Sequence, residues 1–204
     1  VENWRVEILK DSEKPKNAAD KIELITALND IEPVQIILRS DVDFRIENLE
    51  FSDLMGKNNI IKSKNIDYQF VGYRYLEING PGCFDTITNY QRRAPGYFPD
   101  QLIPDKSIDV EAKSSQSIWI RIHIPDSIKP GDYEGKVIVK TNIGDHKLPI
   151  IVKVNDVNIP NPALSDYNWE FWHKMAKIPI EFTDSLGGTK KVFDCENYSD
   201  EWWK

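Results

Sequence analysis

The side chains of this chain that are able to do chemistry are scattered along the sequence. The three histidines, His123, His146 and His173, do not have the spacing of metal ligands. The two cysteines, Cys83 and Cys195, match no zinc pattern and are expected to be separate free thiols, with a disulfide as the alternative if the fold brings them together. The sequence contains no Ser/His/Asp or Cys/His set with supporting context and no glycine-rich phosphate loop. We therefore expect no metal site and no cofactor.

Aromatic and acidic residues gather at the C-terminal end. Four of the six tryptophans, Trp169, Trp172, Trp202 and Trp203, lie there, and the last two follow an acidic pair, Asp200–Glu201. The carboxylate pair invites an acid–base role, but adjacent acidic residues are also common on surface turns. The stretch is too short to bury its own tryptophans, and an exposed aromatic cluster normally marks an interface. It is expected either to open a second domain or to dock on another chain.

Residues 118–154 indicate the architecture that must position these groups. Four isoleucines at 118, 120, 122 and 124 alternate with Trp119, Arg121 and His123, which is the period of a half-buried strand. Pro130–Gly131 is expected to make a hairpin turn into a returning strand over 133–140, and a third strand follows over 148–154. Three short antiparallel strands of this kind predict a β-sandwich.

The rest of the first 160 residues fits the same fold class. Further strands are expected over residues 4–9, 22–28, 34–38, 44–49 and 66–78. Residues 79–106, rich in proline and glycine, are expected to form a long ordered loop. Four charged residues in and around this loop could line a groove or tie this domain to another; they are Glu77, Asp85, Arg92 and Arg93.

Charge and hydropathy exclude two kinds of partner. The net charge is −7 and the basic residues form no stripe, so nucleic acid is not expected to bind. No apolar run reaches the length of a membrane span. The first residues lack the pattern of a signal peptide, so either the protein is intracellular or a leader was removed.

A stiff linker is expected at Pro160–Pro162, where two prolines stand within three residues. We therefore expect a sandwich domain over residues 1–160 and a linker with the start of another domain over residues 161–204.

Three segments of the chain resemble the N-terminal domain of glycoside hydrolase family 123, the β-N-acetylgalactosaminidase family, and its uncharacterised bacterial relatives. They are Ala27–Leu38, with its Asn-x-x-Glu-x-x-Gln pattern; Gly96–Pro104, with Pro-Asp-x-Leu-x-Pro; and Ile118–Gly135, ending in Pro-Gly-x-Tyr-x-Gly. The last pattern alone is weak, because many sandwich modules of bacterial glycosidases share it. One departure is Asp30, where the family often has Glu.

The resemblance implies an all-β, two-sheet antiparallel, immunoglobulin-like β-sandwich followed by the start of a (β/α)₈ barrel that is mostly absent from this chain. A complete barrel needs about 250 residues. Tyr167–His173 would be the first barrel strand, and Trp169, Trp172 and His173 would contact the glycan substrate, although both tryptophans could equally be core residues.

The resemblance also implies a function. Family enzymes resemble substrate-assisted retaining glycosidases, an exception to the two-carboxylate rule. Asp200–Glu201 lies too early in the chain to be the family's catalytic pair, so we expect no catalytic residue here. The chain would be a non-catalytic region supporting the barrel of the same polypeptide, with an extracytoplasmic location.

Two alternatives stay open at this point. The first is a carbohydrate-binding module that presents Tyr68, Phe70, Tyr73 and Tyr75 on one sheet face. The second is an immunoglobulin-like interaction domain that uses the aromatic tail to bind a partner protein.

Overall fold

The computed structural model describes residues 1–3, 6–14, 18–77, 94–160, 181–183 and 189–191. The chain divides into two compact units, Val1–Leu164 and Ser165–Lys204. Within the second unit the described part is an antiparallel pair, β13 (Glu181–Thr183) and β14 (Thr189–Lys191). The predicted strand Tyr167–His173 lies outside the described residues, and the predicted division at residue 160 stays a prediction.

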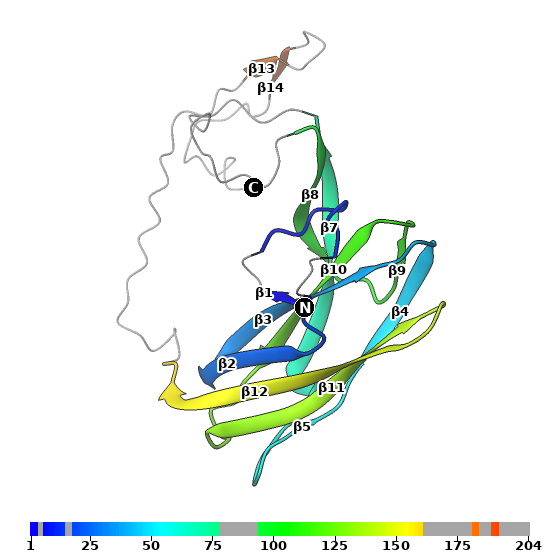
Figure 1. Ribbon diagram of the computed structural model, residues 1–204. Coiled ribbons are helices and arrows are strands. Elements are labelled where there is room, and N and C mark those ends of the chain that lie inside the picture. Colours follow the sequence, from blue (N-terminus) through cyan, green and yellow to red (C-terminus); the bar gives the residue numbers. More distant parts are fainter. Residues whose placement is uncertain (4–5, 15–17, 78–93, 161–180, 184–188, 192–204) are drawn as a thin grey trace. The chain divides into compact units, whose positions relative to one another are not determined.

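The first unit is a sandwich of two sheets (Figure 1). Sheet A has the strand order β1-β3-β10-β7-β8. Its strands are β1 (Glu2–Asn3), β3 (Ile31–Arg39), β7 (Ile66–Leu76), β8 (Gly96–Ile103) and β10 (Ser115–His123). All its neighbouring strands are antiparallel.

Sheet B has the order β2-β12-β11-β4-β9, and the short strands β5 and β6 extend it beside β11. Its strands are β2 (Ile22–Leu28), β4 (Phe44–Phe51), β5 (Leu54–Met55), β6 (Ile60–Ile61), β9 (Ile108–Val110), β11 (Gly131–Thr141) and β12 (His146–Asn158), and a short 3₁₀ turn, η1 (Ser63–Asn65), precedes β7. The expected all-β, two-sheet sandwich is therefore confirmed. Within it one pair, β2 with β12, is parallel.

The core lies between the sheets and is built from the alternating residues of each strand. In β10 the isoleucines at 118, 120 and 122 are fully buried, while Trp119, Arg121 and His123 are half-buried on the outer face. Phe70 of sheet A and Tyr133 of sheet B are among its largest fully buried side chains. The period-two pattern in the sequence identified the buried face of β10 correctly.

The expected hairpin between residues 118 and 135 is wrong. β10 belongs to sheet A and β11 to sheet B, so the two strands are not paired. The connection between them carries Ile124 and Ile128, which are both buried in the core. It therefore crosses from one sheet to the other instead of turning back beside β10. The next connection is a true hairpin, because β11 and β12 are antiparallel neighbours.

Two other expectations need correction. The strand expected over residues 4–9 is not found at residues 6–9, the part of that range that the structure describes, where Ile8 and Leu9 are buried without strand pairing; β1 covers Glu2–Asn3. The predicted loop 79–106 contains β8, despite Pro99 within it. A proline is tolerated there because β8 is the edge strand of sheet A and its outer side needs no amide donor.

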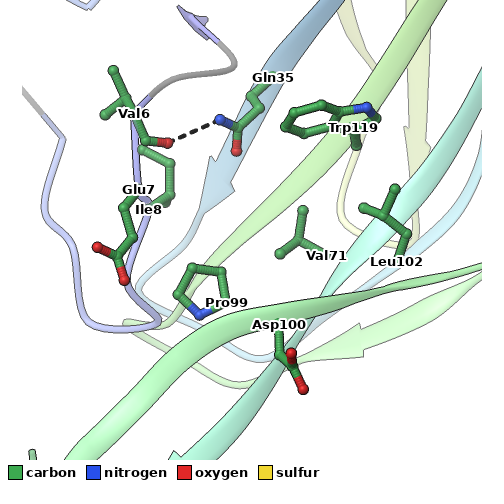
Figure 2. A pocket seen from close by; sticks show the side chains of 9 residues that line it. All are labelled: Val6, Glu7, Ile8, Gln35, Val71, Pro99, Asp100, Leu102 and Trp119. Atoms are coloured by element: carbon green, nitrogen blue, oxygen red, sulfur yellow. Dashed lines mark hydrogen bonds between the residues drawn. The ribbon is translucent and has the colours of Figure 1, made fainter. Parts of the chain in front are cut away.

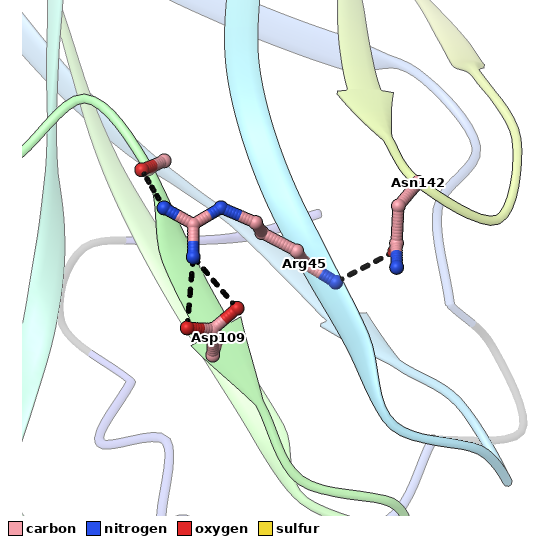
Figure 3. A network of polar contacts seen from close by, with 4 residues as sticks. Arg45, Asp109 and Asn142 are labelled. Atoms are coloured by element: carbon pink, nitrogen blue, oxygen red, sulfur yellow. Dashed lines mark hydrogen bonds and ion pairs between the residues drawn. The ribbon is translucent and has the colours of Figure 1, made fainter.

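A polar network joins β4, β9 and the turn between β11 and β12 (Figure 3). The Arg45 guanidinium donates to both carboxylate oxygens of Asp109, at 2.9 and 2.8 Å, and to Ser107 Oγ at 2.6 Å. The Arg45 amide donates to Asn142 Oδ1 at 2.7 Å. A single nitrogen, Nη1, reaches both oxygens of Asp109, and the exposure of the pair to water limits its contribution to stability. The network fastens the short edge strand β9 to sheet B.

Candidate functional site

A groove of about 350 Å³ lies on the outer face of sheet A (Figure 2). Its apolar surface comes from three strands: Trp119 of β10, Val71 of β7, and Pro99 and Leu102 of β8. The irregular segment Val6–Ile8 forms a wall beside these strands. Glu7 from this wall and Asp100 from β8 are both exposed and bring two carboxylates to the rim. We call this site the Trp119 groove.

Gln35 of β3 fixes the wall of the groove to the sheet. Its side-chain Nε2 donates to the Val6 carbonyl at 2.9 Å (Figure 2), and its Oε1 accepts from Ser117 Oγ at 2.6 Å. Gln35 and Ser117 are both buried, so their hydrogen bonds satisfy groups that would otherwise be costly to bury. The amide of Gln35 therefore acts as a structural support.

An aromatic strip, formed by Tyr73, Tyr75 and Tyr97, extends from the groove along β7 and β8. A bulge in β8 creates it: Val71 pairs with Leu102 and Tyr73 with Pro99, so three steps on β8 match two on β7. The shift turns Pro99 and Tyr97 to the same face as Val71 and Tyr73. Next along the strands, the Tyr75 and Tyr97 rings stack edge to face at 5.1 Å, and Lys10 Nζ lies 4.8 Å from the Tyr97 centroid.

Tyr73 lies between the groove and this exposed pair and is itself more buried. Its hydroxyl oxygen accepts a 3.4 Å hydrogen bond from the Ser117 amide. Burial raises the pKa of Tyr73 to about 12, and this hydrogen bond opposes the shift only weakly. The phenol therefore stays neutral throughout the physiological range.

A charged cluster occupies the other end of the same sheet face. Arg121 Nε donates to Asp67 Oδ1 at 2.8 Å, and His123 Nε2 lies 2.8 Å from Asp67 Oδ2. Burial raises the pKa of the Asp67 carboxyl, but the two hydrogen bonds outweigh burial and leave that pKa below its ordinary value. Both basic groups are engaged by one carboxylate, which is the arrangement of a structural ion pair across neighbouring strands.

The turn between β2 and β3 holds the end of β12, an arrangement that we call the exit clamp. Asn29 Nδ2 donates to the Ile159 carbonyl at 2.7 Å, and the Ile159 amide donates to the Leu28 carbonyl at 2.9 Å. The carboxylate of Asp30 accepts from Thr26 Oγ1 at 3.0 Å and from the Ile31 amide at 2.8 Å. Asn29 has a φ of +59°, which asparagine tolerates better than most residues.

The predicted sugar-contacting residues Trp169, Trp172 and His173 lie outside the described residues, as do Asp200, Glu201, both cysteines, Asp85, Arg92 and Arg93. The predicted aromatic face is only partly correct. Phe70 is fully buried and Tyr68 packs against the core, so these two face inward. Tyr73 and Tyr75 lie on the outer face, where Tyr97 and Trp119 join them. The sequence signal for Trp119 was its alternation with buried isoleucines. Asp100 belongs to the Pro-Asp-x-Leu-x-Pro pattern, which gave it no role, and nothing marked Glu7.

Within the described ranges, no three His, Cys, Asp or Glu side chains are placed to hold a metal ion. The same part of the chain contains no helix long and apolar enough to cross a membrane.

Comparison with solved structures shows what the sandwich is similar to. A family 123 glycoside hydrolase from Clostridium perfringens matches with a TM-score of 0.60 and 21% identity, over 72% of this chain and 25% of that enzyme. The chain thus corresponds to about a quarter of the enzyme's length. A PapD-like domain of human CEP192 matches with a TM-score of 0.38 and 12% identity, over 78% of this chain and all of that one. The CooA pilin subunit of enterotoxigenic Escherichia coli matches with a TM-score of 0.34 and 10% identity, over 68% of this chain and 92% of that one.

No curated protein sequence matches the chain significantly. The model of the glycoside hydrolase 123 N-terminal domain matches residues 10–141, which is more than half of the chain and covers strands of both sheets. This chain therefore belongs to the family of glycoside hydrolase 123 N-terminal domains.

Proposed function

We propose that this chain is a non-catalytic β-sandwich that supports the catalytic barrel of a glycoside hydrolase within the same polypeptide. The sandwich would cover residues 1–160, and residues 161–204 would be the linker and the first segment of the barrel. In that polypeptide Trp169, Trp172 and His173 would contact the glycan.

The non-catalytic role rests on the nature of the acidic groups in the described sandwich. A general acid of a glycosidase needs a carboxyl group whose surroundings keep it protonated near neutral pH, usually by burial. Glu7 and Asp100, the two carboxylates of the Trp119 groove, are exposed to solvent. Asp67 is engaged by Arg121 and His123, which favour its ionised form. None of the three has the environment of an acid catalyst. The pKa of Glu32 is raised by burial and by the nearby Asp30, but Glu32 is not among the residues that line the groove.

The supporting role rests chiefly on the exit clamp. Two hydrogen bonds, from Asn29 Nδ2 to the Ile159 carbonyl and from the Ile159 amide to the Leu28 carbonyl, hold the backbone just before Pro160. The next residues carry two prolines, which stiffen an extended chain. A fixed exit followed by a stiff linker would orient whatever domain the chain continues into.

The chemistry of the whole enzyme is proposed from the family. It would hydrolyse terminal β-linked N-acetylhexosamine by substrate-assisted retention, in which the 2-acetamido group of the sugar attacks its own anomeric carbon. A glycan substrate outside the cell agrees with an extracytoplasmic location. The Clostridium perfringens family 123 enzyme, to which the sandwich is similar, hydrolyses glycolipid glycans.

An activity assay tests the division of roles. The 204-residue chain is expected to release no 4-nitrophenol from 4-nitrophenyl N-acetyl-β-D-galactosaminide. A polypeptide that continues past Lys204 into a family 123 catalytic domain is expected to release it. Turnover by the short chain, lost on Glu7→Gln or Asp100→Asn, would contradict the proposal.

Substitution of Asn29 tests the exit clamp. Asn29→Gly removes the side-chain donor but tolerates the positive φ, and we expect it to lower the free energy of unfolding by about 0.5–1.5 kcal/mol. Asn29→Ala should cost more, because alanine also strains that backbone conformation. Hydrogen exchange of the Ile159 amide should accelerate in both variants. Unchanged exchange at Ile159 would mean that Asn29 does not fix the exit.

A further inference from the structure

We propose that the Trp119 groove binds a neutral saccharide. This goes beyond the proposed function, because it assigns a ligand to the domain that carries no catalysis. Two observations carry it: the groove leaves several hydrogen-bonding groups unused, and an exposed aromatic strip continues from it along the same sheet face.

The unused groups are one donor and two acceptors. Within the part of the chain that the structure describes, the indole N–H of Trp119 and the carboxylates of Glu7 and Asp100 have no hydrogen-bond or ion-pair partner. Gln35, at the back of the same groove, is by contrast committed to Val6 and Ser117. The two acidic residues come from different segments, the N-terminal wall and β8, and both belong to the lining of the groove and are exposed.

This combination suits a pyranose ring better than other ligands. Neighbouring hydroxyl groups can donate to a carboxylate, and a hydroxyl or ring oxygen can accept from the indole N–H. The C–H face of the ring can pack on Trp119, Val71 and Pro99, since binding sites typically join an apolar surface to a few placed polar groups. Two carboxylates on the rim disfavour an anionic sugar. A cation could use the carboxylates and the face of the Trp119 ring, but it would leave the indole N–H without an acceptor.

The aromatic strip gives the site room for more than one sugar unit. Tyr75 and Tyr97 are 51% and 42% exposed, and they are directly paired across β7 and β8. Between this pair and the groove lie Tyr73 and Pro99, the next cross-strand pair. Lys10, two residues beyond the wall residue Ile8, lies over the Tyr97 ring, which places that ring on the same face as the groove. An oligosaccharide could therefore extend from Trp119 towards Tyr75.

Titration of the folded chain with neutral sugars tests the inference. The probes are N-acetylgalactosamine, lactose and N,N′-diacetylchitobiose, with glucuronate as the anionic control. We expect at least one neutral sugar to shift the Trp119 indole N–H resonance saturably at millimolar concentration, more tightly for a disaccharide than for a monosaccharide, and glucuronate to cause no shift. Absence of a saturable shift with every neutral sugar would overturn the proposal.

Variants decide whether the binding occurs in the groove. Trp119→Phe keeps a ring but loses the donor, while Glu7→Gln and Asp100→Asn weaken one acceptor each. Isothermal titration calorimetry follows binding in every variant, because Trp119→Phe has no indole resonance at this position. Each of these three changes should raise the dissociation constant about three- to tenfold. Glu134→Gln, which changes an exposed carboxylate on β11 of sheet B, should leave it unchanged. Equal affinity of all four variants would overturn the assignment to this groove. Loss of binding would leave the non-catalytic role untouched, since the hydrolysis assay tests that role separately.

Discussion

Replacing Tyr133 by alanine is expected to lower the free energy of unfolding by about 3–5 kcal/mol, as for other large aromatic residues in protein cores. The side chain is 2% exposed and belongs to the core between the sheets. Its ring also packs against the backbone of Gly56, where an added Cβ would lie 2.8 Å from Tyr133 Cε1. Truncation would leave a cavity that the two sheets cannot close without moving. Urea denaturation of the 204-residue chain measures the loss.

A second substitution separates packing from hydrogen bonding at the same position. The Tyr133 hydroxyl donates to the Lys129 carbonyl at 2.6 Å, which ties β11 to the connection that precedes it. Tyr133→Phe keeps the ring and leaves that carbonyl without this donor, so we expect a loss of only about 1 kcal/mol. If the phenylalanine variant lost as much stability as the alanine variant, the tyrosine would matter for its hydroxyl and not for its volume.

The sequence could predict the faces of strands but not their partners. In β10 the alternation of isoleucines with Trp119, Arg121 and His123 identified the buried side, because burial acts on each residue separately. The same alternation does not indicate which strands lie beside β10 in the sheet. The segment after Pro125 therefore looked like a hairpin turn, although Ile124 and Ile128 anchor a crossing between the sheets. Pairing depends on contacts between distant segments, and short-range patterns do not report these.

The candidate site was hidden for a related reason. Its aromatic residue, Trp119, could be assigned to the outer face of a strand from the sequence. Its walls could not, because the Val6–Ile8 segment and β8 reach it from opposite directions along the chain. The prolines of β8 predict a loop, since prolines are rare in strands that are paired on both sides. The inward position of Phe70 and the outward position of Tyr75 follow from the period of two along β7, because the two residues are an odd number of positions apart.

The outer face of sheet A and the packed parts of sheet B thus serve different purposes. In the described sandwich the outer face of sheet A carries the Trp119 groove and the aromatic strip. In sheet B, the network around Arg45 and the packing of Tyr133 and Gly135 serve the fold itself. Substitutions on sheet A should therefore change binding with little effect on stability, and those in the core of sheet B should do the reverse.

Replacing Gly135 by alanine is expected to destabilise the protein by about 1–3 kcal/mol, the typical effect of overpacking a core. An added Cβ would lie 2.5 Å from Leu54 Cδ2, 2.8 Å from Ser52 Oγ and 3.0 Å from the Asp53 carbonyl oxygen. Leu54 is fully buried, and Ser52 Oγ accepts from the Lys136 amide, so neither can move freely. The sign is informative: with room for a Cβ, the same change would stabilise the protein by about 0.4–1 kcal/mol, because it restricts the unfolded chain.

A double-mutant cycle distinguishes this lack of space from backbone strain. Leu54→Val removes the nearest atom, so Gly135→Ala should cost less in that background, and the two changes should not add. Gly131, in the same Pro-Gly-x-Tyr-x-Gly pattern, is the matched control. Its φ is +145° and nothing lies within 4 Å of an added Cβ, so Gly131→Ala should cost about 1–3 kcal/mol through its conformation alone, with or without Leu54→Val. If the losses in unfolding free energy from Gly135→Ala and Leu54→Val simply added, or if Leu54→Val changed the cost of both glycine substitutions equally, the explanation by lack of space would be contradicted. Gly135 would then be required for its backbone conformation and not for the close contact with β5.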